Sequence, residues 1–118
     1  MYKRQIALTA LLAASCARSP SPSADPIVEK GKPLYAKYCA TCHGVGRNGY
    51  VADNAPSLRT ESFLATASDA FLRAAITRGR PGTAMAAYGS ALGGPLVPED
   101  VNALIAFLKD GGPPSALP

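Results

Sequence analysis

Apolar residues recur at helical spacing in several stretches of the chain, and no stretch shows the strict alternation that is typical of a half-buried strand. The clearest helix is expected over residues 98–109, where Pro98 suits the first helical position and Gly111 suits a left-handed stop. Its apolar positions follow the i, i+3, i+4, i+7 pattern: Val101, Leu104, Ile105 and Leu108. The pattern predicts an amphipathic helix that packs against another element.

Two further helices are expected earlier in the chain. One runs over residues 68–78, with Ser68 as its N-cap and Gly79 as its stop. The other covers about 31–41, and its start is open because Pro33 prefers the first turn of a helix. This second helix either begins beside that proline or kinks there.

The remaining stretches predict one short helix and two long loops. The short helix is expected over residues 60–67, and the loops, rich in glycine and proline, over 44–58 and 79–97. The predicted fold is therefore all-α, with three main helices plus a short one, in a single small domain over residues 26–111. A core of this size is marginal by itself, so we expect a cofactor, a metal or disulfides to supplement it.

The N-terminus has the order of a secretory signal. Two basic residues, Lys3 and Arg4, precede a short apolar run and small residues, which predicts a signal over residues 1–15. The apolar run is too short to cross a bilayer, and no later stretch approaches the required length. We expect the protein to be exported to the bacterial periplasm.

The end of that signal resembles a lipobox, which makes Cys16 the expected site of lipid attachment. The alternative is ordinary cleavage after Ala17, which also fits a small-residue site. Residues 16–25 form a Ser/Pro-rich tether with no means of packing a core, and residues 112–118 a flexible tail. An anchor followed by a tether predicts a lipoprotein held at a membrane.

The segment Cys39-Ala40-Thr41-Cys42-His43 carries the candidate chemistry. Two cysteines at i and i+3 on a helical turn point to the same side, so both thiols can add to the two vinyl groups of one haem. The adjacent His43 offers a neutral imidazole nitrogen to the iron, and C-x-x-C-H is the signature of c-type attachment. The motif predicts one covalently bound haem c.

Three other interpretations of these cysteines fit the chain less well. A thioredoxin-like redox pair requires a βαβ setting, and a structural zinc site requires a fourth ligand. A simple disulfide leaves the neighbouring histidine unexplained.

The second iron ligand follows by elimination. His43 is the only histidine, and Met1 leaves with the signal, so Met85 is the methionine that remains in the mature chain. A methionine can also fill a gap in a core, but Met85 lies in a glycine- and proline-rich loop without apolar periodicity. We therefore expect His43 and Met85 to be the axial ligands.

In this order of motifs the chain resembles the class I cytochromes c, monohaem proteins, over about residues 29–109. The segments that carry the resemblance are Gly31 and Tyr35, Cys39 to Gly44, Ala55 to Leu58, Arg78 to Met85, and the last helix with Phe107. The resemblance implies that the helix before Cys39 crosses the last helix at Gly31. It also implies that the Pro56 carbonyl oxygen accepts a hydrogen bond from His43.

One position departs from the family. Many relatives have a proline directly after the ligand methionine, whereas this chain has Ala86. The departure implies a looser loop and an iron–sulfur bond that is easier to displace.

A haem with both axial positions filled leaves electron transfer as the function, so we expect a carrier rather than an enzyme. Two alternatives remain: a haem-bearing subunit of a larger oxidoreductase, or a ligand-binding or peroxidase-like protein if Met85 dissociates. The absence of a second histidine counts against peroxidase chemistry.

Redox proteins are the expected partners, together with the membrane through the lipid. The net charge of +4 includes two residues of the signal, and haem propionates offset most of the rest, so no nucleic-acid partner is inferred. The chain has three arginines near the expected ligand loop: Arg47, Arg78 and Arg80. They either form a basic rim that steers an acidic partner, or they are solvated surface charges or partners of the haem propionates.

Overall fold

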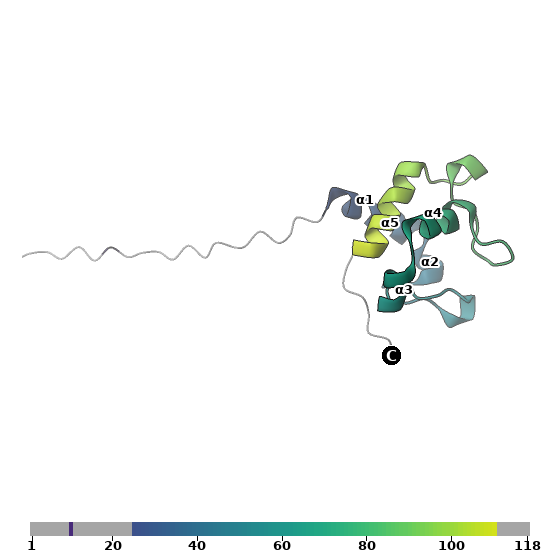
Figure 1. Ribbon diagram of the computed structural model, residues 1–118, viewed down its shortest axis with the longest axis horizontal. Helices are drawn as coiled ribbons and strands as arrows, with labels where there is room; N and C mark the ends of the chain where they lie inside the picture. Colours follow the sequence, from purple (N-terminus) through teal and green to yellow (C-terminus); the bar gives the residue numbers. More distant parts are fainter. Residues whose placement is uncertain (1–9, 11–24, 111–118) are drawn as a thin grey trace, which may run out of the picture.

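The computed structural model of the 118-residue chain describes residue 10 and residues 25–110 (Figure 1). The predicted signal, apart from residue 10, lies outside this part, as do the lipid site at Cys16 and the tail over residues 112–118. Among the helices of the described part, none has the length and apolar character that crossing a bilayer requires.

Helices build the described domain. In chain order these are α1 (Pro26–Tyr38), α2 (Ala40–His43), α3 (Glu61–Thr66), α4 (Asp69–Arg78) and α5 (Pro98–Asp110), with single 3-10 turns η1 (Val51–Asp53) and η2 (Ser90–Leu92). Between residues 25 and 110 the extended backbone pairs only in two isolated bridges, Tyr50 with Ala55 and Gly89 with Leu96. The all-α prediction is confirmed.

Helix α1 begins five residues earlier than its apolar pattern predicted. The side chain of Asp25 accepts a hydrogen bond of 3.1 Å from the Ile27 N–H, and Pro26 occupies the first helical turn. Pro33 therefore lies inside the helix, where its missing N–H removes one hydrogen bond. The helix continues through it, with a buried core residue before the proline, Val28, and another after it, Tyr35.

Helices α1 and α5 cross closely, as Figure 1 shows. Gly31 is buried at the crossing, where an added Cβ would overlap the Ala103 carbonyl group and the Phe107 side chain. The rings of Tyr35 and Phe107 lie beside this point, with their centroids 5.3 Å apart. This is the crossing that the family resemblance implied.

The other predicted helices form with the expected caps. Ser68 and Thr60 each accept a hydrogen bond from a backbone N–H three residues later, of 3.1 Å and 3.3 Å, at the starts of α4 and α3. The core lies between α1, α4 and α5, and its most deeply buried members include Leu96 and Leu104. This core fixes α1, and α1 leads directly into the cysteine motif.

Candidate functional site

Cys39 and Cys42 lie one helical turn apart where α1 passes into α2. The N–H groups of Cys42 and His43 both donate to the Cys39 carbonyl oxygen, at 3.2 Å and 2.9 Å. Both thiols are free; Cys39 is half-buried against the core and Cys42 is exposed. This turn gives the i and i+3 thiols the common side that the motif requires.

The electrostatics of Cys39 do not suit a redox-active pair. Burial, with Cys42 as a second contribution, raises the pKa of the Cys39 thiol to about 11. A reactive cysteine of the thioredoxin kind needs a lowered pKa, because the thiolate is the nucleophile. Cys39 therefore stays a protonated thiol at neutral pH.

The imidazole of His43 is oriented by the loop that follows it. Its Nδ1 lies 3.0 Å from the Pro56 carbonyl oxygen, the contact that the resemblance implied. Because a carbonyl oxygen can only accept, Nδ1 carries the proton and Nε2 keeps a free lone pair. His43 thus presents one nitrogen suited to a metal, held in a fixed tautomer.

A glycine allows Pro56 to reach this histidine. Gly49 has a φ of +78°, and its N–H donates to the His43 carbonyl oxygen at 2.8 Å. A Cβ at Gly49 would lie 2.7 Å from the Pro56 carbonyl carbon, so no other residue fits without a shift. The tight return of residues 49–56 places the acceptor beside His43.

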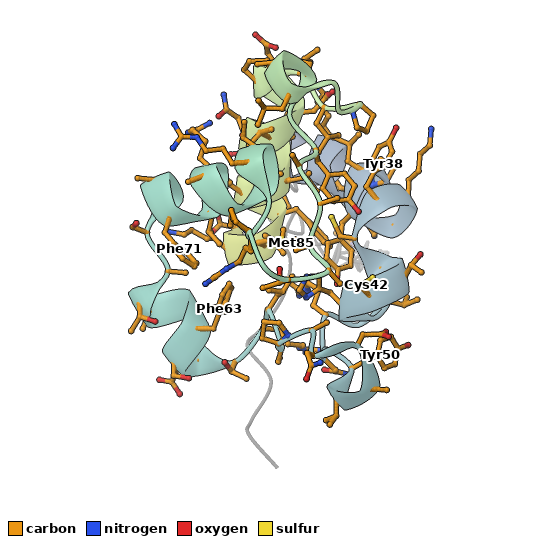
Figure 2. The ribbon with its side chains drawn as sticks, turned by 90° about the vertical axis from the view of Figure 1, so that its right-hand side faces the viewer. Tyr38, Cys42, Tyr50, Phe63, Phe71 and Met85 are labelled. Atoms are coloured by element: carbon orange, nitrogen blue, oxygen red, sulfur yellow. The ribbon has the colours of Figure 1, made fainter. Side chains whose placement is uncertain are left out.

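Met85 lies half-buried on the loop that follows α4. In the view of Figure 2 it is placed between Cys42 of α2 and two aromatic side chains, Phe63 of α3 and Phe71 of α4. The loop is reversed at Gly79, which has a φ of +68° and packs against the backbone of Met85 and Ala86. The fold thus brings the predicted thioether to the side of the domain that carries the cysteine motif.

Several partly buried apolar side chains pack on the core: Leu34, Tyr38, Cys39, Ala40, Leu58, Phe63, Tyr88 and Ala106. The rings of Tyr38 and Tyr88 meet edge to face, with centroids 6.3 Å apart. Sequence reasoning missed Phe63 and Tyr88 as wall residues. The available signal for Tyr88 was an aromatic residue in a loop that is otherwise rich in glycine, alanine and proline.

Arg47 belongs to no basic rim and is not a solvated surface charge, so these two of its three interpretations are wrong. Its side chain is 6% exposed and donates to the carbonyl oxygens of Phe107 and Leu108, at 3.4 Å and 3.3 Å. The guanidinium also lies 5.1 Å from the centroid of the Phe107 ring, and burial lowers its pKa. Arg47 caps the end of α5, where a cation complements the helix dipole.

The other two arginines of that prediction are exposed at the surface. Arg80 places its guanidinium 5.4 Å from the centroid of the Phe71 ring, and Arg78 ends α4. Their charges remain available to solvent.

Together these groups fit a covalently attached haem. Two free thiols one turn apart match its two vinyl groups, and the free Nε2 of His43 matches an iron ligand. Tyr88 lies close enough to Cys39 and Cys42 to interact electrostatically with both, and Figure 2 places Phe63 near Met85, so aromatic side chains are available to contact a porphyrin ring. The donor set therefore agrees with the cofactor expected from the sequence.

Comparison with known proteins agrees with this chemistry. Residues 26–108 match the family model described as cytochrome c oxidase, cbb3-type, subunit III. The solved structure of the KustC0563 c-type cytochrome is 29% identical, with a TM-score of 0.59, over 67% of this chain and 93% of that one. The c-type cytochrome NirC is 28% identical, with a TM-score of 0.55, over 70% of this chain and 88% of that one. No curated protein sequence matches.

A third similar structure is much longer than this chain. The dihydro-heme d1 dehydrogenase NirN, solved in complex with DHE, is 36% identical, with a TM-score of 0.58. The likeness covers 75% of this chain and 17% of that one. The same fold thus forms a small part of a larger enzyme.

Proposed function

The chain belongs to the c-type cytochrome family described as cytochrome c oxidase, cbb3-type, subunit III, and from this we propose that it carries single electrons through a haem with His43 and Met85 as axial ligands. The cofactor is one covalent haem c, and its chemistry is haem-based electron transfer. When bound, haem iron supplies a one-electron couple between the ferric and ferrous states. The observation that carries the ligand assignment is the contact between His43 Nδ1 and the Pro56 carbonyl oxygen.

Cys39 and Cys42 hold the group in place. Thioether bonds from both sulfurs fix the ring to the α1–α2 junction, directly beside His43. Since α1 is packed on α5, this attachment is rigid, and a rigid site changes little between oxidation states. Small rearrangement favours electron transfer.

The two proposed axial ligands have different effects on the iron. The Pro56 carbonyl makes the His43 imidazole more basic through Nδ1, which strengthens its bond to the metal. The Met85 thioether favours the ferrous state and raises the potential relative to ligation by two nitrogens. The pair suits a carrier of moderately high potential.

We propose a carrier rather than an enzyme because His43 and Met85 would hold the iron from both sides and leave it no open position. His43 is the only histidine of the chain and is committed to Pro56 and the iron, so no second imidazole can act as acid or base. A ligand-binding function would require Met85 to dissociate, which the alanine at position 86 makes easier than proline would.

A subunit of a larger oxidoreductase is the second candidate. The likeness to NirN favours it, because a domain of this fold there makes up 17% of the chain. Export to the periplasm and a lipid anchor at Cys16 complete the proposal, supported by the charged, apolar and small residues that open the sequence. Mass spectrometry of the mature protein would report the haem and the lipid together.

Denaturing-gel haem staining tests the attachment. The wild-type protein should keep its stain, and the double variant Cys39→Ser, Cys42→Ser should lose it. Retained stain in the double variant would refute the assignment.

Met85→Ala tests the second ligand. The variant should lack the sulfur-to-iron charge-transfer band of the ferric protein while keeping covalent haem. An unchanged band in Met85→Ala would show that another group binds the iron.

A further inference from the structure

The loop that carries Met85 is closed on itself by backbone hydrogen bonds. At its neck, the Arg80 N–H donates to the Met85 carbonyl oxygen at 3.0 Å. At its tip, the Thr83 N–H donates to the Arg80 carbonyl oxygen at 3.0 Å, across Pro81 and Gly82. With proline second, and glycine at a φ of +79° third, this is the pattern of a type II turn.

The hydroxyl of Thr83 links this turn to Met85. It donates to the Arg80 carbonyl oxygen at 2.7 Å and accepts a hydrogen bond of 3.2 Å from the Met85 N–H. The Thr83 side chain therefore restrains the Met85 backbone from its N-terminal side. The hydroxyl acts on the main chain of Met85 and does not touch its sulfur.

The ends of the loop are already fixed to α4, so movement is confined to the residues between them. Tyr88 and Gly89 donate backbone hydrogen bonds of 3.0 Å and 3.1 Å to the carbonyl oxygens of Ile76 and Thr77. Gly79 packs against Met85 and Ala86, where an added Cβ would lie 2.6 Å from the Ala86 carbonyl carbon. The residues between these fixed ends, which carry Met85, need a further restraint.

The residue after Met85 supplies little of that restraint. A proline at position 86 would fix its own φ and limit the backbone of the residue before it, whereas alanine does neither. Ala86 is also exposed, so its side chain gains little restraint from packing. Thr83 restrains Met85 from the opposite side.

We propose that Thr83 is a positioning residue whose hydroxyl keeps the Met85 sulfur on the haem iron. The inference rests on the proposed ligation by His43 and Met85. One route by which the sulfur leaves is a shift of the Met85 backbone, and that shift breaks the bond to the Thr83 hydroxyl. Removing the hydroxyl lowers the cost of that shift and leaves the His43 side unaffected.

The test is a titration of the ferric holoprotein with imidazole, which competes with Met85 and is followed by loss of the sulfur-to-iron band. Thr83→Val keeps the shape and removes the hydroxyl, and it should lower the half-saturating imidazole concentration roughly three- to ten-fold, the worth of about one hydrogen bond. Thr83→Ser should restore the wild-type value. Thr83→Ala serves as a second variant without the hydroxyl.

Thr66→Val is the matched control. The Thr66 hydroxyl also donates to a backbone carbonyl, that of Ser62 at 2.7 Å, but it lies on α3. Its loss should leave the imidazole midpoint unchanged. Far-UV circular dichroism of all variants should show the same unfolding transition, which separates positioning of Met85 from general stability.

The possible results separate this inference from the proposed function. A wild-type midpoint in Thr83→Val and Thr83→Ala, or a failure of Thr83→Ser to restore it, overturns the role of the hydroxyl while the ligation stands. A wild-type protein without the sulfur-to-iron band overturns the ligation itself, and the inference with it.

Discussion

The hydroxyl of Tyr35 donates a hydrogen bond of 2.6 Å to the carbonyl oxygen of Gly44. Tyr35 is on α1, 2% exposed, and Gly44 directly follows His43. The bond therefore spans the whole cysteine motif and ties its far end back to the helix that precedes it. Burial raises the pKa of Tyr35, so the phenol stays protonated and remains a donor throughout the physiological range.

Replacing Tyr35 by phenylalanine should destabilise the fold. The variant leaves the buried Gly44 carbonyl oxygen without this donor, at a cost of about 1–3 kcal/mol in the free energy of unfolding. Guanidinium titration of the holoprotein measures it. Tyr50→Phe, at a ring that is 49% exposed, is the control and should change little.

Gly31→Ala should lower the free energy of unfolding, whereas a glycine-to-alanine change inside a helix usually raises it. The new Cβ would overlap the Ala103 carbonyl group, so α1 and α5 must move apart, at about 3 kcal/mol or more. Thermal unfolding of the variant should show a lower midpoint temperature than that of the wild type. Lys32→Ala, at the exposed neighbouring position, should leave the midpoint near that of the wild type, and an equal loss there would contradict the close crossing.

Arg47→Leu should destabilise the end of α5. It removes the hydrogen bonds to the carbonyls of Phe107 and Leu108 and the contact with the Phe107 ring, together worth about 2 kcal/mol. Arg47→Lys should not restore the loss, because an ammonium lacks the planar fork. Denaturant titration measures the change in the free energy of unfolding. Arg78→Leu, at an exposed position, is the control. An equal loss at both positions would argue against capping by Arg47.

The two cysteines should differ in reactivity before haem is attached. With a pKa of about 11, the Cys39 thiol is ionised to about one part in a thousand at pH 8, and it is half-buried, whereas Cys42 is exposed. Timed alkylation of the haem-free chain, followed by peptide mass spectrometry, should therefore label Cys42 first. The rate at Cys39 should rise with pH up to about 11. Equal labelling at neutral pH would contradict the burial of Cys39.

The parts of the fold that sequence reasoning predicted are those with local signals. Helices α4 and α5 carry their own caps and apolar stripes, so their bounds followed directly. The predicted start of α1 was five residues too late because Pro33 was given more weight than Asp25 and Pro26, which form a regular helix start. Local patterns cannot decide between two such competing signals.

The residues of the site also divide into those with a local sequence signal and those without one. The cysteine turn and His43 are adjacent in sequence, whereas the contact with Pro56 joins residues thirteen apart and was implied only by the family. Arg47 could not be assigned, since the carbonyls that it caps are sixty positions away and its own loop is glycine-rich and polar. Such partners become visible only when the chain is folded.

The hydrogen bonds that hold the Met85 loop lie within the loop or reach the end of α4, and the crossing of α1 with α5 takes no part in them. The contacts that restrain Met85 and the contacts that join α1 to α5 are therefore separate sets. Substitutions between Pro81 and Ala86 change the first set and leave the second in place. Residues 81–86 can likewise be exchanged as one segment in an engineered variant to adapt the carrier to new partners.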